Sequence, residues 1–136
     1  MNLTLKRTDE AFGMSVTGER GLSIQMDVGP DLGGKDSGMR PMEVLASSLA
    51  GCISVDVILI LRKQRMALNH YLVRIEAKRA EGVPAPFETI HLIFEFSQEV
   101  DKDKAERAVK LAKDKYCSVS ASMNASIRIT HELQFI

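Results

Sequence analysis

The chain has 136 residues, 45% of them hydrophobic, which is enough for one domain spanning residues 1–136 with a real core. Lys and Arg together number 18, as do Asp and Glu, so no net charge attracts nucleic acid or an anionic membrane. The first residues, MNLTLKRTDEAFG, lack the apolar core of a signal peptide. We therefore expect a cytoplasmic protein whose two cysteines are reduced.

The first 28 residues alternate between apolar and polar side chains, as in Leu22, Ile24 and Met26. This period of two is typical of β-strands, and the polar segments 8–10 and 18–21 are suited to turns between them. The pattern predicts a three-stranded antiparallel sheet. Next comes GPDLGGKDSGMR, residues 29–40, which holds four glycines and is predicted to be a loop.

A long apolar segment follows, and we predict a helix over residues 41–66. Pro41 suits the first turn of a helix, and the basic residues at 62–65 suit its last turn. The segment has roughly the 20 residues needed to cross a membrane. Its internal charges, Glu43 and Asp56, favour a buried helix of a soluble protein instead.

The N-terminal half of this helix is rich in small residues, and Gly51 lies near its middle. A glycine there costs about 1 kcal/mol relative to alanine, which predicts a packing reason for it. The remaining elements are too few to bury the helix on all sides within one subunit. We therefore expect a homodimer in which the helix packs against its own copy across a two-fold axis.

The second half of the chain alternates strand and helix patterns. Period-two patterns at 71–77 and 90–96 predict two strands, and 127–135 predicts a last one. A helix is expected at 101–115 and a short helix or turn at 117–124. The predicted fold class is α/β, in the sense of α+β. One face of the helix at 101–115 is expected to be buried: Ala105, Ala108, Val109 and Ala112.

The two cysteines lie 65 residues apart in different settings. Cys52 in the long helix can be a small buried hydrophobe, and Asp56 one turn later disfavours a thiolate unless a cation offsets it. Cys117 opens a predicted turn just after Lys113 and Lys115, a setting that favours a thiolate. The sequence has no CxxC motif and no zinc-ligand spacing, and its three histidines are scattered, so we expect neither a metal nor another cofactor.

Three motifs carry a resemblance to a known family: PMEVL at 41–45, LAGC at 49–52 and YCSVS at 116–120. In this order they resemble the OsmC/Ohr family of osmotically inducible and organic hydroperoxide resistance proteins, along nearly the whole chain. The likeness is greatest to an uncharacterised bacterial branch whose long helix begins Pro-Met-Glu. The resemblance implies an OsmC-like fold that forms an intertwined homodimer around the long helices.

The resemblance also implies a thiol peroxidase acting on small organic peroxides. By position, the pair would lie at the dimer interface, where Cys52 would be the thiol that attacks the peroxide and Cys117 would convert the resulting sulfenic acid into a disulfide. A dithiol reductant, often a lipoyl group in active members, would then regenerate both thiols.

The chain departs from the family pattern at the start of the long helix. Active members have a glutamate directly after the proline, paired with an arginine that activates the thiolate, and this chain has Met42 there. Glu43 comes one residue later, about 100° around the helix and roughly 13 Å along it from Cys52. Arg20, in a Thr-Gly-x-Arg stretch like that of the hydroperoxide branch, and Arg40 are candidates for the arginine. The candidate catalytic set is therefore Cys52 and Cys117, with Arg20 and Glu43 as further members. The alternative roles are an anion favoured by the helix dipole for Glu43 and a residue of a surface turn for Arg20.

The departure at Met42 keeps a second function open. The protein can be a non-catalytic dimer that binds a small hydrophobic ligand or senses the redox state. Dithiol-dependent consumption of cumene hydroperoxide, compared with hydrogen peroxide, distinguishes the two functions.

Overall fold

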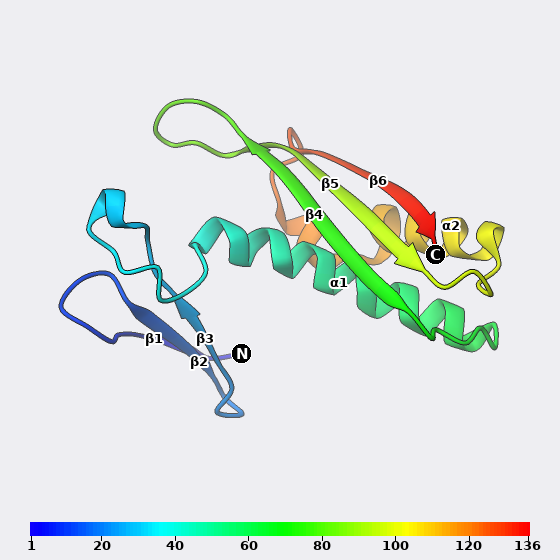
Figure 1. The fold of residues 1–136 in the computed structure, drawn as a ribbon, viewed down its shortest axis with the longest axis horizontal. Helices are drawn as coiled ribbons and strands as arrows, with labels where there is room; N and C mark the ends of the chain where they lie inside the picture. The colour runs from blue at the N-terminus through cyan, green and yellow to red at the C-terminus, as the bar shows by residue number, and fades with distance from the viewer. The chain divides into compact units, whose positions relative to one another are not determined.

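The protein is described by a computed structural model of residues 1–136, which divide into two compact units, Met1–Leu45 and Ala46–Ile136 (Figure 1). The long helix α1 (Pro41–Lys63) begins in the first unit and continues into the second. The mixed α+β class is confirmed. A single domain over the whole chain stays a prediction.

The first unit contains the predicted antiparallel sheet. Its strands follow one another in the order β1 (Leu3–Arg7), β2 (Met14–Gly18) and β3 (Ser23–Met26). Leu5 pairs with Val16, and Val16 pairs with Ile24, so the apolar side chains of the alternating pattern share one face. The glycine-rich loop follows and contains one short 3-10 helix, η1 (Pro30–Leu32).

The second unit contains a sheet of three strands. β4 (Tyr71–Arg79) is antiparallel to β5 (Phe87–Phe96), and β6 (Arg128–Phe135) is parallel to β5. Parallel neighbours need a crossover connection, because the chain must return to the starting edge of the sheet. Three helical segments make this crossover: α2 (Lys102–Leu111), the π-helical turn η2 (Ala112–Tyr116) and α3 (Ser118–Ser122).

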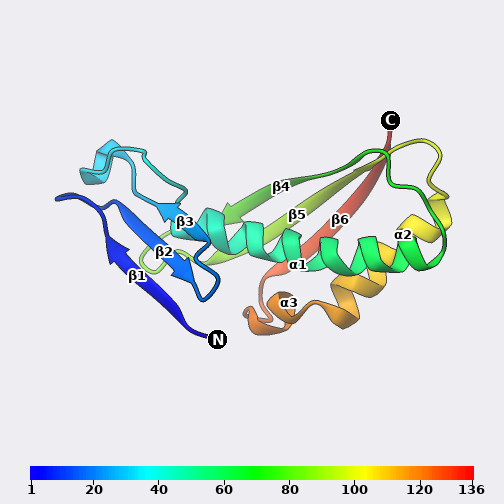
Figure 2. The same cartoon turned by 90° about the horizontal axis from the view of Figure 1, so that it is seen from below.

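The core of the second unit lies between its sheet and its helices. Helices α1 and α2 lie on one face of the β4–β5–β6 sheet (Figure 2). Alternate residues of β5 are fully buried, and so are residues of α1 at helical spacing. The fully buried apolar side chains include Ile90, Leu92, Phe94 and Phe96 of β5, Leu49, Ile53, Val57 and Leu61 of α1, and the alanine face predicted for α2.

A tyrosine ties the sheet to the long helix. The hydroxyl of Tyr71 donates to Ser54 Oγ of α1 at 2.9 Å, and its ring packs edge-on against Phe96 at 5.4 Å between centroids. Burial raises the pKa of Tyr71 to about 12, so the hydroxyl keeps its proton near neutral pH.

Helix α1 is long and apolar enough to cross a bilayer. The core helices of soluble proteins can have the same length and composition, so this finding is weak evidence for a membrane span.

Helix α1 ends at Lys63 rather than at residue 66, which corrects the predicted boundary. Arg65 adopts a left-handed backbone conformation with φ of 58°, and the Met66 amide donates to Leu61 O at 3.0 Å. These features close the helix with the turn that usually carries glycine at the left-handed position. The charged residues at the helix end did not indicate this turn, because arginine rarely adopts a left-handed backbone conformation.

We expect Arg65→Gly to stabilise the protein by about 1 kcal/mol, because glycine adopts the left-handed conformation without the cost that a β-carbon imposes. Urea unfolding monitored by circular dichroism measures the change. Lys63→Gly is the matched control, since Lys63 is the last residue of the helix and glycine there relieves no left-handed conformation, so it should not stabilise the protein. A loss of stability in Arg65→Gly would contradict the assigned turn.

Candidate functional site

Cys52 lies in the interior of α1, one residue before the fully buried Ile53. Its side chain is half-buried, so the thiol belongs to the edge of the core rather than to its centre. The helix holds it between the small residues of its N-terminal half and the bulky residues of its C-terminal half. Asp56, also half-buried, follows one turn later at a position on the same side of the helix.

Cys117 lies at the junction of two helical segments. It follows the π-helical turn η2, where its amide donates to Ala112 O at 2.9 Å, and it caps the N-terminus of α3. The residue is 4% exposed, and its Sγ accepts a hydrogen bond from the Ser120 amide at 3.2 Å. Single π turns are frequently found at functional sites, and this one places the thiol at the start of the next helix.

The structure brings the two cysteines together. Both cysteines are free, and Cys52 lies near enough to Cys117 to influence the pKa of its thiol, although the two residues come from α1 and from the crossover. Burial raises the pKa of Cys117, the neighbouring thiol of Cys52 raises it further, and the amides of Ser120 and Val119 lower it. The two free cysteines are therefore neighbours in the fold, and Cys117 is the more enclosed of the two.

Glu43 accepts a capping hydrogen bond at the start of α1. Its Oε2 accepts the Arg40 amide at 2.8 Å, which is the backbone half of a capping box. The Arg40 guanidinium forms an ion pair with Asp36, and this hydrogen bond raises the pKa of Arg40. Arg20 lies exposed in the turn between β2 and β3. Arg20, Arg40 and Glu43 belong to the first unit and the thiol pair to the second, so a catalytic role for Arg20 or Glu43 stays a prediction.

A buried carboxylate organises the glycine-rich loop, and the sequence did not lead us to it. Asp27 is fully buried and accepts four hydrogen bonds: from the amides of Val28 at 2.8 Å, Lys35 at 3.1 Å and Ser37 at 3.0 Å, and from the Ser37 hydroxyl at 2.7 Å. These bonds, the two from Ser37 first among them, hold the pKa of Asp27 well below its ordinary value. The sequence did contain one indication of this role: Asp27 and Ser37 lie at the two ends of a glycine-rich segment, and aspartate side chains often accept hydrogen bonds from loop amides.

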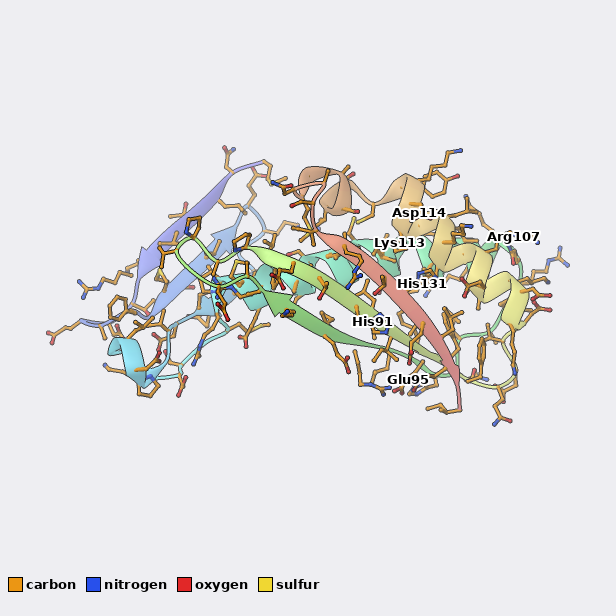
Figure 3. The ribbon with its side chains drawn as sticks, turned by 90° about the horizontal axis from the view of Figure 1, so that it is seen from above. His91, Glu95, Arg107, Lys113, Asp114 and His131 are labelled. Carbon is orange, nitrogen blue, oxygen red and sulfur yellow. The ribbon has the colours of Figure 1, made fainter.

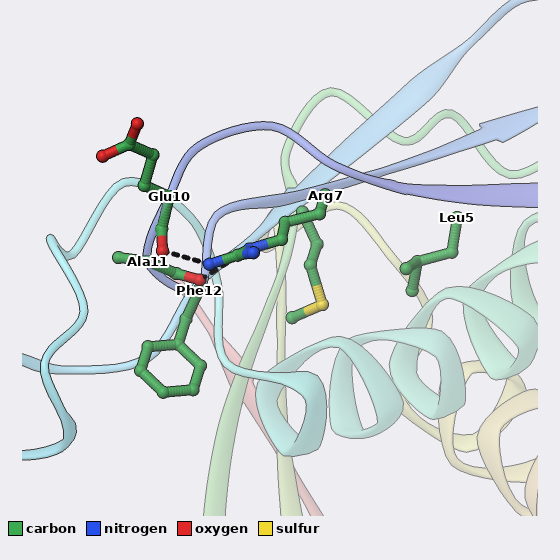
Figure 4. A pocket seen from close by; sticks show the side chains of 6 residues that line it. Leu5, Arg7, Glu10, Ala11 and Phe12 are labelled. Atoms are coloured by element: carbon green, nitrogen blue, oxygen red, sulfur yellow. Dashed lines mark hydrogen bonds between the residues drawn. The ribbon is translucent and has the colours of Figure 1, made fainter.

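A pocket of about 410 Å³ lies at the β1–β2 turn, within the first unit (Figure 4). Its lining is mainly apolar and comprises Leu5, Arg7, Glu10, Ala11, Phe12 and Met14. The Arg7 side chain donates to the backbone carbonyls of Glu10 and Ala11, the latter at 3.0 Å, and so closes the turn. A small apolar molecule would fit the chemistry of this lining.

The histidines pair separately with carboxylates. His131 Nε2 lies 2.9 Å from Glu106 of α2, and His91, whose side chain lies on the sheet (Figure 3), is 3.7 Å from Glu132. His70 lies 3.4 Å from Glu95, which also forms an ion pair with Arg74. The structure contains no group of three His, Cys, Asp or Glu side chains suited to hold a metal.

The model of the OsmC-like protein family matches residues 34–132, a range that contains both cysteines. The chain belongs to the OsmC-like family. Among curated OsmC-like relatives, Protein YhfA of Escherichia coli is 32% identical over 125 residues, which cover 91% of this chain and 92% of YhfA.

Solved structures of other proteins show the same OsmC fold. A hypothetical protein from Aquifex aeolicus matches with a TM-score of 0.80 and 29% identity, over 99% of this chain and 96% of that one. An organic hydroperoxide resistance protein OsmC from Legionella pneumophila matches with a TM-score of 0.72 over 98% of this chain and 97% of its own. At 16% identity the Legionella likeness establishes the fold alone.

Proposed function

We propose that this OsmC-like protein reduces organic hydroperoxides with the thiol pair Cys52 and Cys117. The observation that carries the proposal is the proximity of two free cysteines from distant parts of the chain, one of them half-buried and one enclosed. A peroxidase that works through a disulfide needs this arrangement, because the second sulfur must reach the first before water or another peroxide does. Organic hydroperoxide resistance proteins among the structural neighbours support the substrate class.

The proposed reaction proceeds in three steps. The Cys52 thiolate attacks the peroxide, the O–O bond breaks, an alcohol leaves, and Cys52 becomes a sulfenic acid. Cys117 then attacks that sulfur, and water leaves as the disulfide forms. A dithiol, of the lipoyl class by the family resemblance, restores both thiols and is itself oxidised to a disulfide. A cytoplasmic location, where thiols are kept reduced, suits this cycle.

Treating the reduced protein with cumene hydroperoxide should produce an internal disulfide between Cys52 and Cys117. Because each cysteine gives up one hydrogen, mass spectrometry under non-reducing conditions should show the loss of two hydrogens, and peptide mapping should join the two residues. Hydrogen peroxide at the same concentration is the comparison and should react more slowly. Two free thiols after an excess of cumene hydroperoxide would rule out the peroxidase.

We also propose that the protein is a homodimer that pairs through α1. Three residues at four-residue spacing form an exposed stripe on the helix: Gly51, Val55 at 59% exposure and Leu59 at 48%. Apart from its chain neighbours and the nearby backbone of its own helix, a β-carbon at Gly51 would meet no atom within 4 Å, so the packing reason expected for this glycine is not found inside one chain. A second copy of α1 laid along the stripe would supply it and would bury the apolar side chains.

Gly51→Leu should weaken the dimer by about 1–3 kcal/mol, because the added side chain overpacks the proposed contact. Light scattering over a dilution series measures the mass and the dissociation constant. Gly51→Ala is the control, since it adds one methyl group and should raise the helix propensity. A wild-type mass equal to one chain at micromolar concentration, or an unchanged dimer in Gly51→Leu, would overturn the proposed pairing face.

The pocket at the β1–β2 turn favours a second candidate function, the binding of a small hydrophobic ligand without catalysis. The two candidates differ in one measurement. A peroxidase consumes cumene hydroperoxide in a dithiol-dependent way over many turnovers, whereas a binding protein leaves its concentration unchanged beyond the amount bound.

A further inference from the structure

Arg7 stands at a position of β1 where the alternating pattern calls for an apolar residue. Leu3, Leu5 and Arg7 share one face of the strand, because successive side chains of a strand point to opposite faces. In the antiparallel pairing Arg7 lies opposite Met14 of β2. The apolar row of β1 therefore ends in a guanidinium, and this guanidinium lines the pocket at the β1–β2 turn.

The guanidinium of Arg7 has a fixed orientation but no acidic partner. Its Nε donates to Ala11 O at 3.0 Å and its Nη2 donates to Glu10 O, and it forms no ion pair with a carboxylate of the chain. Glu10 also lines the pocket, but its carboxylate points away from the guanidinium (Figure 4). An anion at this place would neutralise a positive charge that the protein leaves unpaired.

The turn around the pocket is held in shape by its own contacts. Asp9 Oδ1 accepts two amides of the turn, at 2.8 Å and 3.0 Å, and Asp9 pairs with Lys35 of the glycine-rich loop at 3.5 Å. The ring of Phe12 lies against the same loop, where a β-carbon built on Gly33 would be 3.7 Å from it. A site formed before binding loses little free energy to ordering when a ligand enters.

We propose that this pocket binds a small aromatic carboxylate. The ligand's ring packs against Phe12, which is 47% exposed, and against Met14, since aromatic rings and thioethers both make favourable contacts with a ring. The ligand's carboxylate accepts hydrogen bonds from Arg7. The volume of about 410 Å³ is in the range of small-molecule sites. The inference rests on the second candidate function, which it narrows to one class of ligand, and it does not depend on the peroxidase.

Two probes of nearly the same shape test the role of the charge: 1-naphthylacetate and its neutral amide, 1-naphthylacetamide. Each is titrated into the isotope-labelled full chain, and the backbone amide signals in nuclear magnetic resonance spectra give both the dissociation constant and the residues affected. We expect the largest shifts at residues 7–14. At low salt the carboxylate should bind about threefold to fivefold more tightly than the amide, as an exposed ion pair allows.

The preference for the carboxylate should decrease toward equal affinity in about 1 M sodium chloride, because salt screens exposed charges. Equal affinities of the two probes at low salt, with shifts at residues 7–14, would overturn the inference and leave the second candidate function standing. If neither probe binds, or if the shifts lie outside the pocket, both the inference and binding in this pocket are overturned. The two failures are therefore distinguishable.

A set of variants assigns the preference to one side chain. Arg7→Gln should abolish the preference for the carboxylate, and Glu10→Gln should raise it about twofold by removing a like charge from the lining. Lys6→Gln is the matched control and should keep the preference, because Lys6 lies on the opposite face of β1 and does not line the pocket.

The ratio of the two affinities separates the charge of Arg7 from its part in closing the turn. A distorted turn would weaken both probes equally, whereas a lost ion pair weakens the carboxylate alone. A preference that persists in Arg7→Gln, or that disappears in Lys6→Gln, would overturn the role of Arg7. If Arg7→Gln does not fold, the salt dependence of the wild type and the result for Glu10→Gln decide.

Discussion

Replacing Cys52 with serine should lower dithiol-dependent consumption of cumene hydroperoxide by at least roughly 10³-fold, because a hydroxyl group is a far weaker nucleophile than a thiolate near neutral pH. The residue is half-buried and the replacement is close in size, so the fold should survive the change. The peroxide remaining is measured over time with the dithiol in excess. Circular dichroism of the variant, compared with the wild type, serves as the folding control.

The companion change, Cys117→Ser, should separate the two thiols by role. We expect one turnover of peroxide per chain, followed by a stable sulfenic acid on Cys52, since the sulfur that would convert it to a disulfide is gone. Dimedone labels sulfenic acids, and mass spectrometry locates the label. A label on Cys117 in Cys52→Ser, together with an inactive Cys117→Ser, would exchange the two roles.

Replacing Asp27 with asparagine should lower the melting temperature by roughly 5–10 °C, since one of the two oxygens that accept loop amides becomes a donor facing other donors. The substitution affects the hydrogen bonds from Lys35 and Ser37, which hold the glycine-rich loop around the carboxylate. Differential scanning calorimetry measures the melting temperature. Asp31→Asn is the matched control, because Asp31 is exposed in the same loop. Equal melting temperatures for Asp27→Asn and the wild type would contradict the structural role.

The Asp27 carboxylate also predicts the acid dependence of stability. Its pKa is lowered in the folded protein, so its contribution is fully present above the unfolded value of about 3.9 and is lost as the pH falls toward the folded value. The gap in melting temperature between the wild type and Asp27→Asn should be constant from pH 7 to about 5 and should narrow below about pH 4. A gap that widens in acid would show that the pKa is raised instead.

The strands and helices could be predicted because their side-chain periods are local. The alternation of Leu22, Ile24 and Met26 predicted β3, and the alanines of residues 105–112 predicted the buried face of α2. The ends of the helices could not be predicted as well, because they depend on backbone conformations that the type of side chain indicates only weakly. Arg65 ends α1 in a conformation that glycine usually supplies, and the predicted helix at 101–115 ends in a π turn.

The site could be predicted only in part, because contacts between distant segments leave no local trace. The motifs around Cys52 and Cys117 indicated the two thiols, while their proximity depends on how α1 and the crossover come together in the fold. Nothing in the spacing of the two cysteines indicated that the Ser120 amide would donate to one of the sulfurs. Asp27 was overlooked because a polar residue at the end of an alternating strand usually faces solvent, and here a loop folds around it.

The parallel pairing of β5 with β6 has a consequence for the order of folding. Cys117 lies in the crossover between these two strands, and β6 is the last element of the chain. Until β6 pairs, the segment that carries Cys117 is anchored at one end only, and closing such a loop is entropically slow. The crossover that carries Cys117 is therefore anchored at both ends only once β6 has been made and has paired, so a chain synthesised only as far as the crossover has Cys52 without a fixed partner.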